Sequence, residues 1–355
     1  MKSQSIRTLP PVSFALGAAV LFGASTPSAK VLLGTVDPVI LAGLLYLGSG
    51  SGLVLWWGLR LWWRGGNSQE VSIQGADLLW LIGAILTGGV VGPILLMVGL
   101  SSTPASSASL LLSLEGVLTA ILAWFVFKEH FDHRIVLGMV AITTGSLLLS
   151  WEGQPEIGLP WGVFAIVGAC LAWAIDNNLT RKVSGGNLLQ IAGAKGLIAG
   201  VVNLAIAFAT GARMPGLHLI LTAAVVGLLG YGISLMLFVL ALRHLGTART
   251  SAYFSLAPFV GAAFSLLALD ERPTLFVLIA TVFIGIGMWL HLTERHEHEH
   301  WHERLEHDHQ HIHDEHHQHT YSEEPHSHPH LHQQMLHSHF HYPDLHHRHG
   351  HSRHA

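Results

Sequence analysis

Four charged residues stand inside long apolar stretches of the sequence: Lys30, Glu115, Asp176 and Lys195. A charge at the centre of a membrane-spanning helix costs about 2.5–3.5 kcal/mol on insertion scales, so such a residue usually faces a cavity or a partner. Ionisable groups in this position typically bind ions or solutes, or carry protons. Two of the four are cations and two are acids, so they can also neutralise one another.

Glu115 lies about ten residues into the apolar stretch 105–127, which places it closest to the middle of a span. This position makes Glu115 the candidate for a carboxylate that carries a proton or binds a cation. The alternative is a structural ion pair with Lys195 or Lys30. The sequence leaves both interpretations open.

Asp176 and Asn177 bring several oxygen atoms together near the end of the apolar stretch 160–180. These atoms can line the path of a polar solute, or Asp176 can instead interact with the basic pair at 181–182. Lys30 can border the same path, or its long side chain can reach the membrane interface. Asp176, Asn177, Lys195 and Lys30 therefore join Glu115 as candidate pathway residues.

Histidines supply a second kind of chemistry, because 23 of the 28 lie after residue 293 and recur there at every second position. Alternation puts imidazoles on one side of an extended chain, and neutral imidazole binds Zn, Ni, Co and Cu. The tail therefore predicts metal binding, although a solvated pH-responsive tail with incidental affinity is the alternative. The candidate ligands are His296, His298, His300, His302, His307, His309, His311, His313, His326, His328, His330 and His332.

An apolar body precedes this polar tail. Half of the 355 residues are apolar, mean hydropathy is +0.45, and 11% are charged. Stretches of about 20 apolar residues match the thickness of a bilayer, so we expect an all-α integral membrane body followed by a disordered tail. A single cysteine, Cys170, excludes a disulfide within one chain. The predicted spans are 12–33, 39–59, 78–99, 105–127, 135–151, 160–180, 188–210, 217–241, 247–269 and 274–292.

Basic residues predict how these spans are oriented. With the N-terminus inside, ten basic residues fall in cytoplasmic segments and only two, Arg213 and Arg272, in external loops. Positive charge is retained on the cytoplasmic side, so we expect a protein of the bacterial-type inner membrane with both ends cytoplasmic.

The body also contains an internal repeat, because four residues recur at an offset of 142. The matched pairs are Ser109 and Ser251, Ser113 and Ser255, Glu129 and Glu271, and Gly145 and Gly287. Five spans in each half force the halves into opposite orientations, and inverted repeats place a solute site where they meet. The predicted domains are an N-terminus at 1–11, repeats at 12–151 and 158–293, and the histidine-rich tail at 294–355.

Two five-helix halves, each with a glutamate after its fourth span and glycines in its fifth, resemble the EamA type of the drug/metabolite transporter superfamily. The family's end-of-span glutamate corresponds to Glu129 and Glu271, and its frequent ninth-span proline to Pro258. Residues 115–116 depart from the pattern, because proline often stands there. The resemblance implies a ten-helix secondary transporter that moves small metabolites, usually outward.

Three functions follow from these observations. The first is a secondary exporter of a small metabolite with a metal-binding regulatory or buffering tail. The second is an efflux carrier for a divalent transition metal or its complex, and the third is a metal-responsive sensor without transport. The expected partners are the bilayer, a small-molecule substrate and divalent metal ions, and a homodimer is compatible with the sequence. No P-loop, nucleophile elbow, dinucleotide motif or basic aromatic run is present, so we expect no enzyme, required cofactor or nucleic-acid partner.

Overall fold

The structure is a computed structural model that describes residues 11–63, 78–127, 133–151, 161–183, 188–292, 297–302, 305–311, 326–332 and 335–340. The chain divides into two compact units, Met1–Thr293 and Glu294–Ala355. The described part of the first unit is helical, and the described part of the second consists of short strands.

Apolar runs in the body form helices because a helix satisfies its backbone hydrogen bonds internally, as a lipid environment requires. Most helices follow the predicted spans, but α11 continues through 242–246, where a connection between two spans was expected. In the first half the helices are α1 Pro11–Leu33, α2 Pro38–Trp63, α3 Leu78–Ala84, the π-helical η2 Ile85–Val91, α4 Gly92–Ser102, α5 Ala105–Leu111, α6 Leu114–Phe127 and α7 His133–Trp151. In the second half they are α8 Trp161–Val183, α9 Leu188–Ala209, α10 Leu217–Gly227, the π-helical η3 Leu228–Ile233, α11 Ser234–Phe254, α12 Ala257–Ala268 and α13 Leu275–Leu292.

The body has the surface of a membrane protein. Within the described residues, eight helical stretches are long and apolar enough to cross a bilayer, and two shorter apolar helices, Ala257–Ala268 and Leu275–Leu290, follow them. Large apolar side chains lie on the outside, with exposed fractions of 77% for Leu79 and 87% for Leu267. A soluble monomer rarely exposes so much apolar surface, whereas lipid solvates it. The chain is therefore a multi-pass membrane protein.

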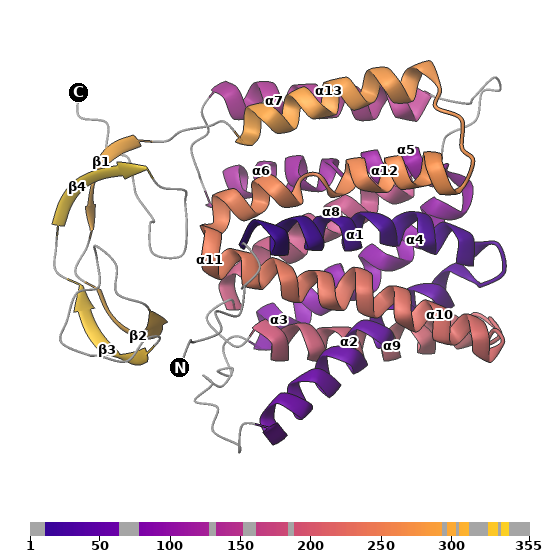
Figure 1. Ribbon diagram of the computed structural model, residues 1–355, viewed down its shortest axis with the longest axis horizontal. Helices are drawn as coiled ribbons and strands as arrows, with labels where there is room; N and C mark the ends of the chain where they lie inside the picture. The colour runs from indigo at the N-terminus through magenta and orange to yellow at the C-terminus, as the bar shows by residue number, and fades with distance from the viewer. Residues whose placement is uncertain are drawn as a thin grey trace, which may run out of the picture. The chain divides into compact units, whose positions relative to one another are not determined.

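Helices α7 and α13 lie side by side at one edge of the body (Figure 1). A Cβ atom at Gly145 would lie 2.9 Å from the carbonyl oxygen of Ala280, and one at Gly287 would lie 2.6 Å from that of Gly138. The two contacts are reciprocal, because Gly287 and Ala280 each stand 142 positions after Gly145 and Gly138. The last helix of each half thus presents the same face to its counterpart.

Other helix contacts also recur when each helix is replaced by its equivalent in the other half. Helix α2 packs against α9, its counterpart in the other half. Helix α1 packs against α11 and α12, while α8 packs against α4 and α6. Among its described residues, each half contains one π-helical segment and one break within its fourth span, at 112–113 and at 255–256. Pro258 stands in the first turn of α12, where its missing N–H leaves no helical bond unmade.

The described residues of the second unit form four strands, β1 Glu297–His302, β2 Leu305–His311, β3 His326–His332 and β4 Met335–Phe340. Strand β1 pairs antiparallel with β4, and β2 pairs antiparallel with β3. The prediction of a disordered tail is wrong for these segments. The alternation of histidine with other residues has the period of a β-strand, and cross-strand bonds satisfy the backbone.

The contact between α7 and α13 predicts a difference between two glycines of one helix. Replacing Gly287 with alanine should destabilise the protein by about 1–3 kcal/mol, because its Cβ would meet backbone atoms of α7. Replacing Gly285 with alanine should be tolerated, since its Cβ would meet only Phe259, at 3.8 Å. Thermal unfolding in detergent, followed by tryptophan fluorescence, measures both, and equal midpoints for the two variants would contradict the contact.

Candidate functional site

Helix α8 carries an ion pair inside the body. Lys195 on α9 donates a hydrogen bond to Asp176 Oδ2, and Thr180 donates to Asp176 Oδ1 at 2.9 Å. Asp176 is 7% exposed and lies directly against Gly88 of η2. A Cβ atom at position 88 would lie 1.9 Å from Asp176 Oδ2, so only glycine fits beneath the carboxylate. Two of the predicted pathway residues, Asp176 and Lys195, are therefore brought together.

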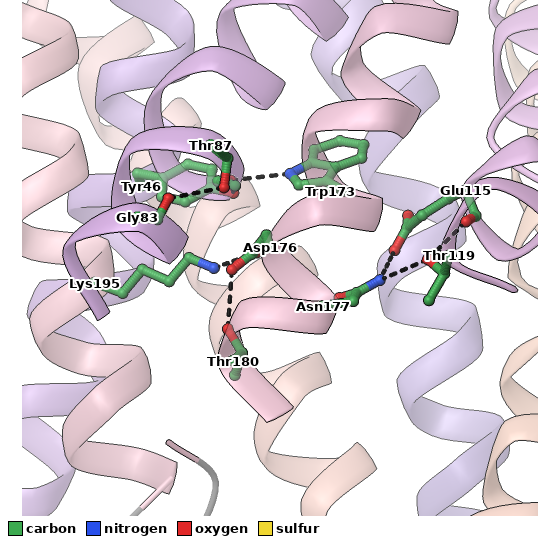
Figure 2. A network of polar contacts seen from close by, with 11 residues as sticks. Tyr46, Gly83, Thr87, Glu115, Thr119, Trp173, Asp176, Asn177, Thr180 and Lys195 are labelled. Carbon is green, nitrogen blue, oxygen red and sulfur yellow. Dashed lines mark hydrogen bonds and ion pairs between the residues drawn. The ribbon is translucent and has the colours of Figure 1, made fainter. Parts of the chain in front are cut away.

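The π-helical segment η2 is held by side chains from α2, α8 and α9. Figure 2 shows two of them, Tyr46 and Trp173. The carbonyl oxygen of Gly88 accepts hydrogen bonds from Tyr46 Oη at 2.8 Å and from Trp173 Nε1 at 2.9 Å. The carbonyl oxygen of Gly89 accepts one from Asn203 Nδ2 at 3.0 Å. A π-helical turn displaces carbonyls from the regular helical pattern, and in lipid these oxygens need internal partners. The side chains thus fix η2 beside the ion pair.

Glu115 lies at the start of α6, after the break at 112–113, and is half-buried. Its carboxylate accepts a hydrogen bond from Asn177 Nδ2 at 2.8 Å, and the same amide donates to Thr119 Oγ1 at 3.4 Å. Asn177 is exposed, and a Cβ atom added at Gly116 would meet nothing within 4 Å. Among the described side chains, Glu115 is bonded to a neutral amide at an accessible surface of the body.

The two halves of this polar group lie on different sides of α8. Figure 2 shows Asp176 directed toward Lys195 on α9, while the next residue, Asn177, is directed toward Glu115 on α6. Consecutive positions on a helix point in different directions. One turn of α8 therefore carries the Asp176 carboxylate toward α9 and the Asn177 amide toward the Glu115 carboxylate on α6.

Lys30 lies elsewhere, at the end of α1. Its ammonium donates hydrogen bonds to the carbonyl oxygens of Leu100 at 2.6 Å, Ser101 at 3.2 Å and Thr103 at 2.8 Å. Neither of the cations considered as partners for Glu115 pairs with it, because Lys30 binds backbone carbonyls and Lys195 binds Asp176.

Two of the three family-motif positions, Glu271 and Pro258, lie in the described part of the structure. Glu271 accepts hydrogen bonds from the backbone N–H groups of Ala105 at 2.8 Å and Ser106 at 3.0 Å. Pro258 stands at the start of α12. Glu129 lies outside the described residues, as do His296 and His313 among the predicted metal ligands, whereas the other ten predicted histidines fall in β1, β2 and β3.

Sequence reasoning missed Tyr46, Trp173 and Thr119 as members of the polar group. Tyr46 and Trp173 stand in the middle of apolar stretches rather than at span ends, where interfacial aromatic residues gather. A tyrosine hydroxyl or tryptophan N–H in mid-span requires a hydrogen-bond partner, so the sequence could have indicated that these two residues bind another polar group. Which partner it finds depends on the arrangement of helices.

The fold and the polar group define a multi-pass helical membrane protein with a buried charged interior. The sequence profile of the EamA-like transporter family matches residues 9–151 and 160–293. The chain therefore belongs to the EamA-like transporter family, in the drug/metabolite transporter superfamily.

Relatives agree with this assignment, and a solved structure shares the fold. An uncharacterized transporter of Methanothermobacter thermautotrophicus is 30% identical over 268 residues, which cover 72% of this chain and 78% of the relative. The probable 4-amino-4-deoxy-L-arabinose-phosphoundecaprenol flippase subunit ArnE of Pseudomonas fluorescens is 34% identical over 88 residues, 25% of this chain and 75% of that protein. A crystal structure matches with a TM-score of 0.59 and 18% identity, covering 79% of this chain and 96% of its own, which shows a shared fold.

The ion pair on α8 predicts a non-additive response to substitution. Lys195→Met should destabilise the protein by up to about 3–5 kcal/mol, because Asp176 would keep a buried charge without its partner. Adding Asp176→Asn to Lys195→Met should recover much of this loss, since both charges are then absent. Thermal midpoints of the two single variants and the double variant test the pair, and additive losses would contradict it.

Proposed function

We propose that this member of the EamA-like family is a secondary active exporter of a small organic metabolite, built from ten spans in two inverted repeats. The profile of one family matches each half of the body, and the contacts between α7 and α13 exchange under the offset of 142 residues. The two shorter apolar helices complete ten spans when added to the eight longer ones among the described residues. The distribution of basic residues supports an inner-membrane protein with both ends cytoplasmic.

The translocation path passes Glu115 in this proposal. The main observation in its support is the hydrogen bond from Asn177 to Glu115, which lies in mid-span and at an accessible surface. A carboxylate exposed to hydrocarbon would be costly, so the surface at Glu115 and Asn177 faces an aqueous opening. Asp176 and Lys195 neutralise one another beside it, and their closed pair supports a structural role for them.

Glu115→Gln tests the path. The substitution keeps the size of the side chain and its bond to Asn177 but removes the charge, so we expect flux to fall about tenfold or more, as for an interaction with a charged group. Counterflow into proteoliposomes, screened with labelled amino acids, nucleosides, polyamines and organic acids, measures it. Asp270→Asn, which removes an exposed acid from a loop, is the matched control. Full flux in the Glu115 variant would remove the carboxylate from the path.

The tail adds metal binding to the proposal. Backbone register places histidine opposite histidine on both strand pairs, and opposite residues of an antiparallel pair share one face of the sheet. The opposed pairs are His298 and His339, His300 and His337, His307 and His330, His309 and His328, and His311 and His326. Pairing two runs that are far apart in the sequence concentrates imidazoles, which supports a buffer or regulatory site for Zn, Ni, Co or Cu.

Export of the metal itself is the second candidate, and it rests on the tail. Soft ligands are scarce in the body, which has the single cysteine Cys170 and only 5 of the 28 histidines. A path for a bare transition-metal ion usually needs such donors, so the organic solute is the preferred cargo, and in this proposal the metal acts on the carrier through the tail.

Removing the tail tests this assignment. The intact protein should bind at least about one Zn²⁺ per chain near neutral pH, whereas a chain ending at Arg295 should not. Binding should disappear as pH falls through about 6.5, because a metal ligand must be a neutral imidazole and protonation competes with the ion. Isothermal titration calorimetry of both proteins near pH 7.5 and near pH 5.5 measures this. Equal binding by the shortened chain would place the metal site in the body.

A further inference from the structure

The connection between α4 and α5 is held by a cation from another helix. Lys30 donates to three carbonyl oxygens, of Leu100, Ser101 and Thr103, at the end of α4. The carbonyl end of a helix carries partial negative charge and has orphan acceptors, so an ammonium group is well matched to it. Lys30 thereby joins α1 to the end of α4.

An anion from the second half holds the other side of the same connection. Both carboxylate oxygens of Glu271, between α12 and α13, accept hydrogen bonds from the first backbone N–H groups of α5, those of Ala105 and Ser106. Glu271 also interacts electrostatically with Lys30. The connection between α4 and α5 is thus fastened by two opposite charges, one from each half of the chain.

The start of α8 closes tightly against this connection. A Cβ atom at Gly162 would lie 2.4 Å from Ser102 Oγ and 2.5 Å from Thr103 Oγ1, and one at Gly99 would lie 2.6 Å from the carbonyl oxygen of Gly162. Thr103 is 6% exposed. The backbone of α8 therefore lies directly against the connection at Gly162.

The surface at Glu115 is different. Asn177 lies 15 residues after Gly162 on α8, which corresponds to about 22 Å along the helix axis. There Asn177 is exposed, and a Cβ at Gly116 would meet nothing within 4 Å. The body is therefore closed where Lys30 and Glu271 lie and accessible farther along α8.

We propose that Lys30 and Glu271 form a clamp that closes one end of the translocation path, the external end in the predicted orientation, and that opens when the path turns to that side. The clamp is polar, so water can replace its hydrogen bonds when this end opens. The two residues are positioning residues, because they bind backbone groups of the α4–α5 connection. The inference rests on the proposed transport function, but its test requires no substrate.

A cysteine beneath the clamp reports its state. Ser109 is 1% exposed and lies one turn beyond Ala105, with its hydroxyl 2.6 Å from where a Cβ at Gly261 would lie. Ser109→Cys, combined with Cys170→Ser, places a single thiol there. A membrane-impermeant maleimide is added to right-side-out or inside-out vesicles, and the rate of labelling from each side is measured. Thr26→Cys, which lines the same hollow as Ser109, is a second reporter if the first fails to fold.

Lys30→Met and Glu271→Gln should each speed labelling from the clamp side about tenfold. Each variant removes a charge-assisted hydrogen bond that stabilises the closed state, so the equilibrium shifts toward the open state by about that factor. Arg272→Gln, an exposed charge beside Glu271, is the matched control and should change nothing. Lower thermal stability with unchanged labelling from the clamp side in both variants would overturn the clamp and leave a structural cap.

The two proposals fail separately. Glu115→Gln should lower flux about tenfold or more without changing the rate of labelling at position 109, whereas the clamp variants should change labelling in protein that is never supplied with substrate. Loss of the Glu115 effect would therefore leave the clamp standing, and unchanged labelling would leave the path through Glu115 standing.

Discussion

Backbone groups that leave the regular helical pattern must find partners inside the protein, because lipid offers none. Several side-chain bonds between helices of the described body answer this constraint. Tyr46 and Trp173 bind the carbonyl of Gly88, where η2 departs from α-helical geometry. Lys30 and Glu271 bind opposite ends of two successive helices. Irregular backbone at membrane depth thus determines where polar side chains are needed, and the helices that supply them become fixed to one another.

This constraint separates the intramembrane charges by role. A charge that binds backbone or an opposite charge has its desolvation offset within the folded body, and Lys30, Lys195 and Asp176 are in this position. Glu115, among the described side chains, is bonded to an amide and stands beside open space. In the proposed path, this leaves its charge to be neutralised by a proton or a solute.

Hydropathy predicted where most spans lie and which charges fall inside them, because both properties depend on local composition. It did not predict which charges meet. The sequence offered Lys195 or Lys30 as a partner for Glu115 and the basic pair at 181–182 for Asp176. The pairing of Asp176 with Lys195 became evident only when α8 was placed against α9. The sequence shows the repeat as an offset of 142. That Gly145 and Gly287 make reciprocal contacts became evident only from the packing of α7 against α13. The tail shows the same limit, since alternation placed the imidazoles on one side of an extended chain but did not predict the strands or the pairing of β1 with β4.

A carrier needs two conformations of similar free energy, since a state that is far more stable would trap it. Close contacts between glycines and backbone, such as those between α7 and α13, are lost outright when helices separate and so suit interfaces that move as rigid units. The hydrogen bonds that Lys30 donates and Glu271 accepts are different, because in the proposed cycle each group is rehydrated when its end opens. The net difference between bonds to protein and bonds to water is small. A polar contact is therefore suited to the end of the path that must break and reform in every cycle.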